Sequence, residues 1–188
     1  MKNKAGRSDK PPAKDRYRYF KFFKTMSDYP EIFNKVIEVV LRNEGGYVWS
    51  KSDPGGETNM GITKANYPQE DIKNLTKEKA IHYYYRDYWL PMNLELLNDP
   101  NLILHVFDMG VNSGPKTAIK LLQRLVGTID DGSLGPKTAH AAQSFAGDIV
   151  DEYKKRRKLF YVTLVQNKPE LRVFIKGWLA RIENTKFN

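Results

Sequence analysis

Glu44 and Asp53 are the residues whose types and spacing best suit chemistry. Glu44 ends an apolar helical stretch and directly precedes Gly45 and Gly46. The negative end of a helix dipole and apolar neighbours both disfavour an ionised carboxyl, so we expect the pKa of Glu44 to be raised. A carboxyl that keeps its proton near neutral pH can act as a general acid. The alternative is an ordinary solvated glutamate at a helix end.

Asp53 follows Glu44 after eight intervening residues, in a segment rich in turn residues. A helix end and an adjacent hairpin can place two carboxyls on opposite sides of a cleft. That arrangement suits glycoside hydrolysis, in which one carboxyl protonates the leaving oxygen and the other acts as base, nucleophile or electrostatic stabiliser. An aspartate before Pro-Gly-Gly is also ordinary turn chemistry, and Glu57 is the reserve candidate for the second carboxyl.

The segment around these carboxyls also carries candidate substrate-binding residues. Tyr47 can offer a flat face to a sugar ring, and Thr58, Asn59 and Thr63 can orient a water molecule or a sugar hydroxyl. For each of the last three, cross-strand hydrogen bonding within the hairpin is an equally good explanation.

The elements that must position these residues are mostly helices. A capping-box variant at Asp28–Glu31 and apolar residues at helical spacing predict a helix that ends at Glu44. Short strands are expected at 47–49 and 58–63, as one hairpin. Further helices are predicted at about 76–90, ending before Pro91, after Pro100, and at 115–126, 136–144, 147–166 and 169–184. Their expected core residues include Phe160, Leu164, Phe174, Trp178 and Ile182. The fold class is therefore mainly α, with one small β-hairpin lobe.

The charge of the chain is concentrated at its start. The 31 basic and 22 acidic residues give a net charge of +9, and residues 1–25 contribute +7 of it. We expect this basic tail to be disordered, because it lacks the apolar residues that a packed segment needs. The rest of the chain is nearly neutral, which argues against nucleic acid as a partner. An anionic cell envelope remains a suitable partner for the tail.

Several classes of site and location are not expected. The chain has no cysteine, and its three histidines are isolated, so we expect no metal site and no cofactor. No apolar stretch is long enough for a transmembrane helix. The charged start is not followed by the apolar region of a signal peptide, which predicts synthesis in the bacterial cytoplasm.

Taken in order, the motifs resemble those of glycoside hydrolase family 108. These are bacterial and prophage N-acetylmuramidases, some of which are called secretion activator proteins. The resemblance covers about residues 32–184 and is specific through its ordered combination of motifs. The motifs that carry it lie at 44–47, 52–56, 58–63, 88–89, 108–115, 121–124, 132–138 and 177–178.

The resemblance implies a lysozyme-like helical fold with Glu44 as the catalytic acid. After the basic tail at 1–25, it implies a lysozyme-like catalytic half at 26–106 and a peptidoglycan-binding-like half at 107–188, packed on the same core. Asn112 and Ser113 then become candidate substrate-binding residues. Glu44 and Asp53 keep the spacing of the Glu and Asp pair in phage lysozymes. However, Asn59 stands where those enzymes have a threonine, and Thr58 lies one position earlier.

The implied function is hydrolysis of the β-1,4 bond between N-acetylmuramic acid and N-acetylglucosamine in peptidoglycan, without a cofactor. The alternatives are a lysozyme-like protein that binds cell wall or serves secretion without catalysis, and a lytic transglycosylase. The expected partner is the glycan strand, bound by a monomer that acts at the cell wall or in the periplasm and does not insert into the membrane.

Overall fold

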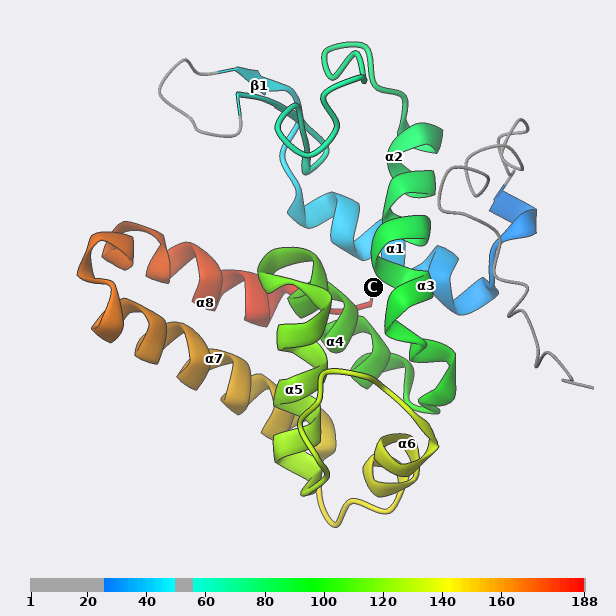
Figure 1. The fold of residues 1–188 in the computed structure, drawn as a ribbon, viewed down its shortest axis with the longest axis vertical. Coiled ribbons are helices and arrows are strands. Elements are labelled where there is room, and N and C mark those ends of the chain that lie inside the picture. Colours follow the sequence, from blue (N-terminus) through cyan, green and yellow to red (C-terminus); the bar gives the residue numbers. More distant parts are fainter. Residues whose placement is uncertain (1–25, 50–55, 188) are drawn as a thin grey trace, which may run out of the picture.

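The computed structural model describes residues 26–49 and 56–187, which form a mainly helical fold with one small sheet (Figure 1). The sheet and the loop that follows it make an upper lobe, and helices α4 to α8 make a lower one. The prediction of a mainly α fold with a small β lobe is confirmed. The elements, in chain order, are η2 (Met26–Asp28), α1 (Glu31–Asn43), β1 (Val48–Trp49), β2 (Glu57–Asn59), β3 (Ile62–Thr63), α2 (Lys77–Tyr84), η3 (Tyr85–Trp89), α3 (Leu90–Met92), η4 (Leu94–Leu96), α4 (Pro100–Ser113), α5 (Pro115–Val126), α6 (Pro136–Gln143), α7 (Ile149–Asn167), η5 (Pro169–Phe174) and α8 (Ile175–Asn184).

Helix α4 is the central helix of the fold. Every residue from Leu102 to Gly110 is buried, because α1, α5, α7 and η3 pack around it. The helix begins after Asp99, whose Oδ1 accepts hydrogen bonds from the backbone N–H groups of Asn101 and Leu102 at 2.8 and 3.1 Å. This aspartate satisfies two of the donors that a helix start leaves unpaired. A helix buried on all sides carries few polar residues unless they have partners.

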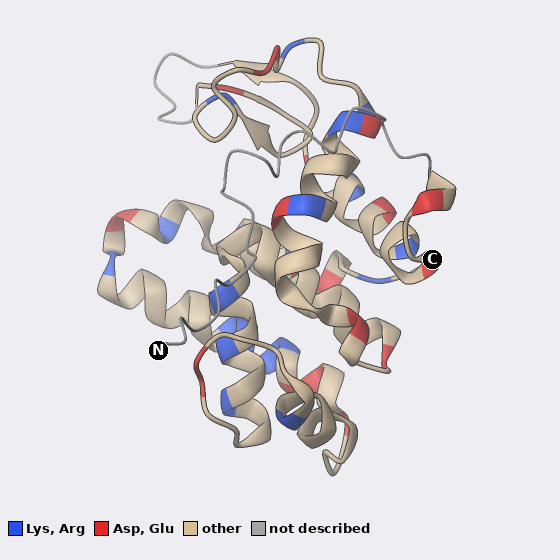
Figure 2. Cartoon of the chain, turned by 45° about the vertical axis from the view of Figure 1, so that its right-hand side comes forward, with Lys and Arg blue, Asp and Glu red and all other residues tan. Residues whose placement is uncertain are grey.

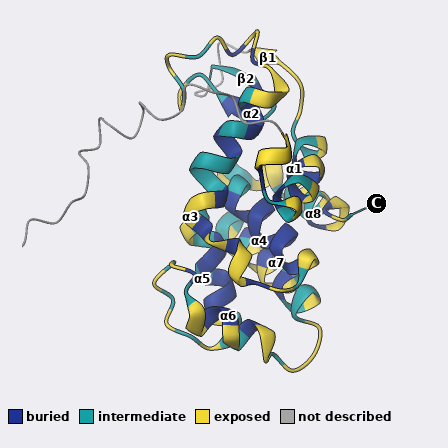
Figure 3. Ribbon diagram, turned by 90° about the vertical axis from the view of Figure 1, so that its right-hand side faces the viewer, coloured by how far each residue is buried: buried dark blue, intermediate teal, exposed yellow. Residues whose placement is uncertain are grey.

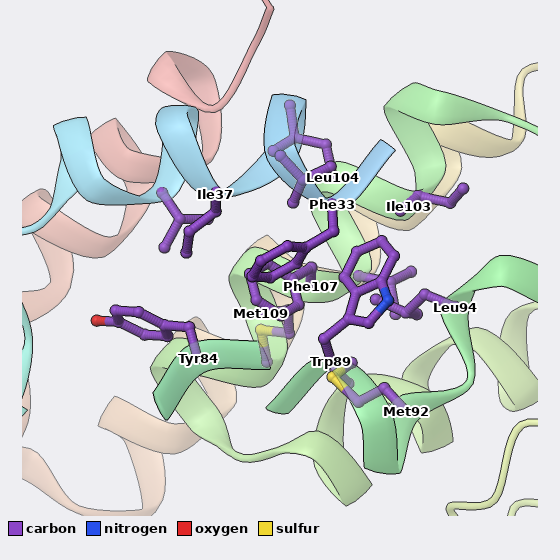
Figure 4. Close-up of a cluster of buried hydrophobic side chains, with 14 of the residues drawn as sticks. Phe33, Ile37, Tyr84, Trp89, Met92, Leu94, Ile103, Leu104, Phe107 and Met109 are labelled. Carbon is purple, nitrogen blue, oxygen red and sulfur yellow. The ribbon is translucent and has the colours of Figure 1, made fainter. Parts of the chain in front are cut away.

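One continuous hydrophobic core joins the first helix to the last. Phe33 of α1, Trp89 of η3 and Phe107 of α4 meet edge to face, with ring centroids 5.1 to 6.1 Å apart (Figure 4). Such edge-to-face contacts add to the stability that burial of the rings provides. The same core reaches Tyr153 and Tyr161 of α7 and Ile182 of α8, and the exposed residues lie around it (Figure 3).

The sheet has three strands rather than the two of a single hairpin. β1 pairs with β2 through Val48 and Thr58, and β2 pairs with β3 through Thr58 and Thr63, both antiparallel. The predicted strand 58–63 is therefore wrong as one strand, because the chain turns back at Met60 and Gly61. Both turn residues have positive φ, at 49° and 75°. Glycine adopts that conformation without a steric penalty.

The second long helix continues past Pro91 instead of ending before it. Directly after α2, the helix widens into a π-helical segment, η3, and the N–H of Leu90 at its end bonds to the carbonyl of Tyr85. A proline inside a regular α-helix removes a hydrogen bond and crowds the carbonyl four residues earlier. The wider turn before Pro91 accommodates this, and the helix ends instead at Asn93, whose φ is +51°.

Two other predictions differ from the structure at helix ends. Helix α1 begins after Pro30 without a side-chain cap, so the predicted capping box at Asp28 is wrong. The predicted helix 169–184 divides into the 3-10 segment η5 and the helix α8. In this division Phe174 becomes exposed rather than buried, whereas Ile182 is buried as expected.

Charged residues are spread along the helices of both lobes, with basic and acidic side chains interspersed (Figure 2). Among the described residues, none of the helices combines the length and the apolar character that crossing a bilayer requires. The predicted tail at residues 1–25 lies outside the described residues.

Candidate active site

Glu44 is the first residue after α1, and its side chain lies at the junction of the two lobes. Its backbone is extended, and its N–H still bonds to the carbonyl of Val40 at 3.1 Å, which fixes the residue to the end of the helix. The side chain is only 16% exposed. A carboxyl so placed needs partners, because burial without them is costly.

The two oxygens of the Glu44 carboxyl have different surroundings. Oε1 accepts a hydrogen bond from Nη2 of Arg181 on α8 at 2.8 Å. Oε2 faces the turn between β2 and β3, where a Cβ added to Gly61 would lie 2.7 Å from it and would also collide with the hydroxyl of Tyr84. Among residues 26–49 and 56–187, no hydrogen bond to Oε2 is present. Gly61 is therefore required both by its backbone angle and by the space that Glu44 occupies.

Arg181 connects Glu44 to a buried network of charges. Its Nε and Nη2 both bind Oδ1 of Asp108, at 2.9 and 2.8 Å. The other oxygen of Asp108 accepts from Nη2 of Arg157 at 2.6 Å, and the side chains of Asp108 and Arg157 are completely buried. Nη1 of Arg157 lies 3.0 Å from Nδ1 of His105. Four helices thus meet at these charges: α4, α7 and α8 with the end of α1.

The hydrogen bond between Arg157 and His105 determines the protonation state of His105. A guanidinium can only donate, so Nδ1 of His105 accepts, and the imidazole is neutral with its proton on Nε2. Burial and the neighbouring charge of Arg157 lower the pKa of His105 to about 4. Burial alone would raise the pKa of Asp108, but the guanidiniums of Arg157 and Arg181 outweigh it and hold the pKa of Asp108 below its usual range.

Two tyrosines complete the surroundings of Glu44. The hydroxyl of Tyr84 donates to the carbonyl of Met60 at 2.9 Å, which ties α2 to the β2–β3 turn. In Figure 4 this hydroxyl points away from the buried cluster. Burial, and next the negative charge of Glu44, raise the pKa of Tyr84. Burial and the charges of Asp87 and Glu44 raise the pKa of Tyr88, whose ring lies 5.7 Å from that of Tyr84. Both tyrosines are therefore neutral hydrogen-bond donors at physiological pH.

The predicted sugar-contact residues of the sheet have separate partners. Tyr47 is exposed and its hydroxyl donates to Oε1 of Glu57 at 3.1 Å. Asn59 is buried, and its Nδ2 donates to the carbonyl of Ile72 at 3.0 Å, so this amide holds the loop before α2. Thr63 Oγ1 accepts from the N–H of Asn66 at 3.3 Å. Thr58 is half-buried at the centre of the sheet.

Asn112 and Ser113, the two candidates at the end of α4, lie side by side. Nδ2 of Asn112 donates to the hydroxyl of Tyr161 at 2.6 Å, and Oγ of Ser113 lies 3.0 Å from the same hydroxyl. The Tyr161 ring stacks on Trp178 with centroids 4.9 Å apart. Both polar residues thus fix the end of α4 to α7. Asp53, the predicted second carboxyl, lies outside the described residues.

The residues that sequence reasoning missed are the partners of Glu44. Arg181 and Arg157 lie far from Glu44 in the sequence, and Asp108 stands out there only as the first residue of the motif at 108–115. One signal was present: Asp108 interrupts an otherwise apolar helix, and a lone carboxylate there requires cations. His105 is isolated from the other histidines in the sequence, whereas in the structure it is a member of this network. No group of three metal-ligating side chains occurs in the described part of the chain.

Comparison with known proteins agrees with this geometry. Residues 37–114 match the family model described as "Glycosyl hydrolase 108", and residues 117–183 match one described as "Predicted Peptidoglycan domain". No curated protein sequence matches the chain significantly. The solved structure of SagA from Brucella abortus is 33% identical, with a TM-score of 0.69, and the match covers 81% of this chain and 90% of that one. The fold is thus lysozyme-like and the protein is peptidoglycan-related: the chain belongs to glycosyl hydrolase family 108.

Proposed function

We propose that the protein is an N-acetylmuramidase, which hydrolyses the β-1,4 bond between N-acetylmuramic acid and N-acetylglucosamine. The observation that carries this proposal is the placement of Glu44. One of its oxygens is held by Arg181, and the other faces the turn of the sheet at the junction of the lobes. A carboxyl held in one orientation through one oxygen, with the other oxygen left to donate, is what proton transfer to a glycosidic oxygen requires.

In the proposed reaction, Glu44 transfers a proton from Oε2 to the glycosidic oxygen as the bond from that oxygen to the anomeric carbon breaks. Asp53 stabilises the oxocarbenium charge or accepts the proton of the attacking water, whose oxygen then bonds to the anomeric carbon. Arg181 stabilises the carboxylate that Glu44 becomes after it gives up its proton. The same guanidinium fixes the direction of the carboxyl throughout.

The decisive experiment compares Glu44→Gln with a matched glutamate on the same helix. Glu38 lies on α1, is half exposed and pairs with Lys77, away from Glu44. We expect Glu44→Gln to abolish release of reducing ends from purified cell walls and Glu38→Gln to retain it. Mass spectrometry of the products should show reducing N-acetylmuramic acid. Full activity of Glu44→Gln would contradict the proposed acid, and anhydro-muramic ends would instead indicate a lytic transglycosylase.

A second candidate function is wall binding without cleavage. It is supported by the ion pair of Glu44 with Arg181, because a carboxylate that ties the end of α1 to α8 has a structural role that requires no catalysis. The match of residues 117–183 to a peptidoglycan domain also fits this function. Cosedimentation of the wild-type protein with cell walls, without any release of reducing ends, would select it.

We also propose that the protein acts at the cell wall or in the periplasm after synthesis in the cytoplasm, because its substrate lies there. Immunodetection in fractionated cells tests this. Recovery only from the cytoplasmic fraction, under conditions in which walls are cleaved, would contradict it.

A further inference from the structure

A pocket of about 730 Å³ lies beside the candidate active site and has no assigned role. Its walls come from the loop between β3 and α2, from the last part of α2 and from η3, and Pro115 at the start of α5 closes one side. The volume is within the range typical of sites for small molecules. The pocket therefore lies between the loop of the upper lobe and the start of α5 in the lower one.

The pocket contains a preorganised pair of aromatic rings. Tyr67 stacks on Tyr83 with centroids 4.5 Å apart and an interplanar angle of 25°. The hydroxyl of Tyr67 donates to Oδ2 of Asp87 at 2.6 Å. The guanidinium of Arg86 lies 5.0 Å from the Tyr83 ring centroid. Because the hydroxyl of Tyr67 is hydrogen-bonded and its ring is stacked on the buried ring of Tyr83, the pair is fixed before any ligand arrives, which reduces the entropic cost of binding.

The charged groups of the pocket neutralise one another. Arg86 forms a two-point ion pair with Asp87, with both hydrogen bonds at 2.6 Å. Glu70 pairs with Nζ of Lys79 at 3.0 Å. A charged ligand, such as the peptide stem of peptidoglycan with its carboxylates, would have to displace these pairs. An uncharged ligand with hydroxyl and amide groups would not.

The rim of the pocket carries groups that suit such an uncharged ligand. The side-chain amides of Asn66 and Gln69 are exposed there, and each combines a donor with an acceptor. Pro68 and Pro115 add apolar surface. A rigid aromatic wall with amides at its edge can hold the apolar face of a pyranose ring and bond to its hydroxyl or acetamido groups.

Two tyrosines connect the pocket to the surroundings of Glu44. Tyr88 lines the pocket, and its ring contacts Tyr84, whose hydroxyl meets the β2–β3 turn where Glu44 lies. The negative charge of Glu44 acts on both tyrosines. A glycan strand that passes Glu44 at the lobe junction can thus continue over Tyr88 into the pocket.

We propose that this pocket is a saccharide subsite that binds an uncharged pyranose of the glycan strand, with an N-acetylglucosamine unit as the best fit. The proposal rests on the proposed function, since it assumes that the strand runs past Glu44. Tyr67 and Tyr83 form its wall, and Gln69 bonds to the sugar at its rim.

Calorimetric titration tests the subsite separately from catalysis. The probe is a peptide-free tetrasaccharide of alternating N-acetylglucosamine and N-acetylmuramic acid, added to protein that carries Glu44→Gln so that it is not cleaved. In this background we expect Tyr67→Ala to weaken binding by about tenfold, because an anchoring aromatic is lost. Tyr67→Phe keeps the ring and is the matched control, expected to bind within about threefold of the parent because only one hydrogen bond is lost.

Gln69→Ala is the second variant, because this exposed side chain can be truncated without disturbing the stacked tyrosines. We expect several-fold weaker binding of the tetrasaccharide and no change in thermal unfolding. Unchanged affinity in both Tyr67→Ala and Gln69→Ala would overturn the subsite. So would variants that lose affinity for a free stem peptide but keep it for the tetrasaccharide. Neither result depends on the wall-lysis assay, whose failure would instead contradict the role of Glu44.

Discussion

His105 should make the protein unstable in mild acid, and the amount follows from its buried environment. In the folded protein its pKa is lowered to about 4, whereas in the unfolded chain it has the ordinary value of 6.5. As pH falls below 6.5, His105 binds a proton in the unfolded state but stays neutral in the folded state. The free energy of unfolding therefore decreases until the pH reaches about 4. Between pH 7.5 and 4.5 this single residue should therefore cost about 2.5 kcal/mol of stability.

The variant His105→Asn isolates this contribution. Asn can place its Oδ1 where Nδ1 of His105 accepts the hydrogen bond from Arg157, and it does not titrate. The other ionisable groups near the site, Asp108, Lys154 and Glu183, are shared by both proteins and cancel in the comparison. The lowered pKa of Asp108 lies below the pH range of the experiment.

Urea unfolding at pH 7.5 and 4.5 measures the effect. The wild type should lose about 2 to 3 kcal/mol more than His105→Asn over this range, whatever the variant costs at neutral pH. Equal losses in the two proteins would refute the reasoning. They would mean that His105 is protonated in the folded state and that Arg157 does not donate to it.

Three further substitutions test the structure around Glu44. Asp108→Asn should lower the free energy of unfolding by about 3 to 5 kcal/mol, because it leaves the buried guanidiniums without their counter-charge. Urea unfolding at pH 7.5 measures this loss, and a loss below about 1 kcal/mol would contradict the prediction. Gly61→Ala should lower the free energy of unfolding by about 2 kcal/mol, because residue 61 has a positive φ. The added Cβ should also displace Glu44 and impair wall lysis. A stable and fully active variant would show that the turn does not position the carboxyl. Asn59→Ala should cost about 1 to 2 kcal/mol, because the bond to Ile72 is buried, and thermal unfolding that matches the wild type would argue against that role.

The parts of the fold that local patterns determine were predictable from the sequence. Apolar spacing and glycines located α1, and proline and glycine together bounded α5 between Pro115 and Gly127. The predicted helix end before Pro91 is wrong because the wider π-helical turn of η3 relieves the clash of the proline ring. Whether that wider turn forms depends on the packing of η3 against α4. The predicted burial of Phe174 is wrong because the 3-10 segment η5 changes which side chains face inward.

The candidate site was predictable only at its centre. Glu44 could be chosen because a carboxyl at the end of an apolar helix is electrostatically unusual. Its partner Arg181 lies 137 residues away, and nothing local in α8 distinguishes it from an ordinary surface arginine. Asn59 is a candidate for binding sugar by its residue type, but its amide turns inward and bonds to the carbonyl of Ile72. Residue type alone does not reveal this. Pairings of this kind are set by tertiary packing rather than by spacing.

The ion network has a consequence for how such proteins can be recombined. Glu44 and Asp108 lie in the segment that matches the hydrolase family, whereas Arg157 and Arg181 lie in the segment that matches the peptidoglycan domain. Each segment thus carries only one sign of this buried charge. A chimera that takes its second half from another protein would bury two carboxylates without cations unless both arginines were retained. The two halves are therefore not interchangeable modules, and we expect them to be inherited as a pair.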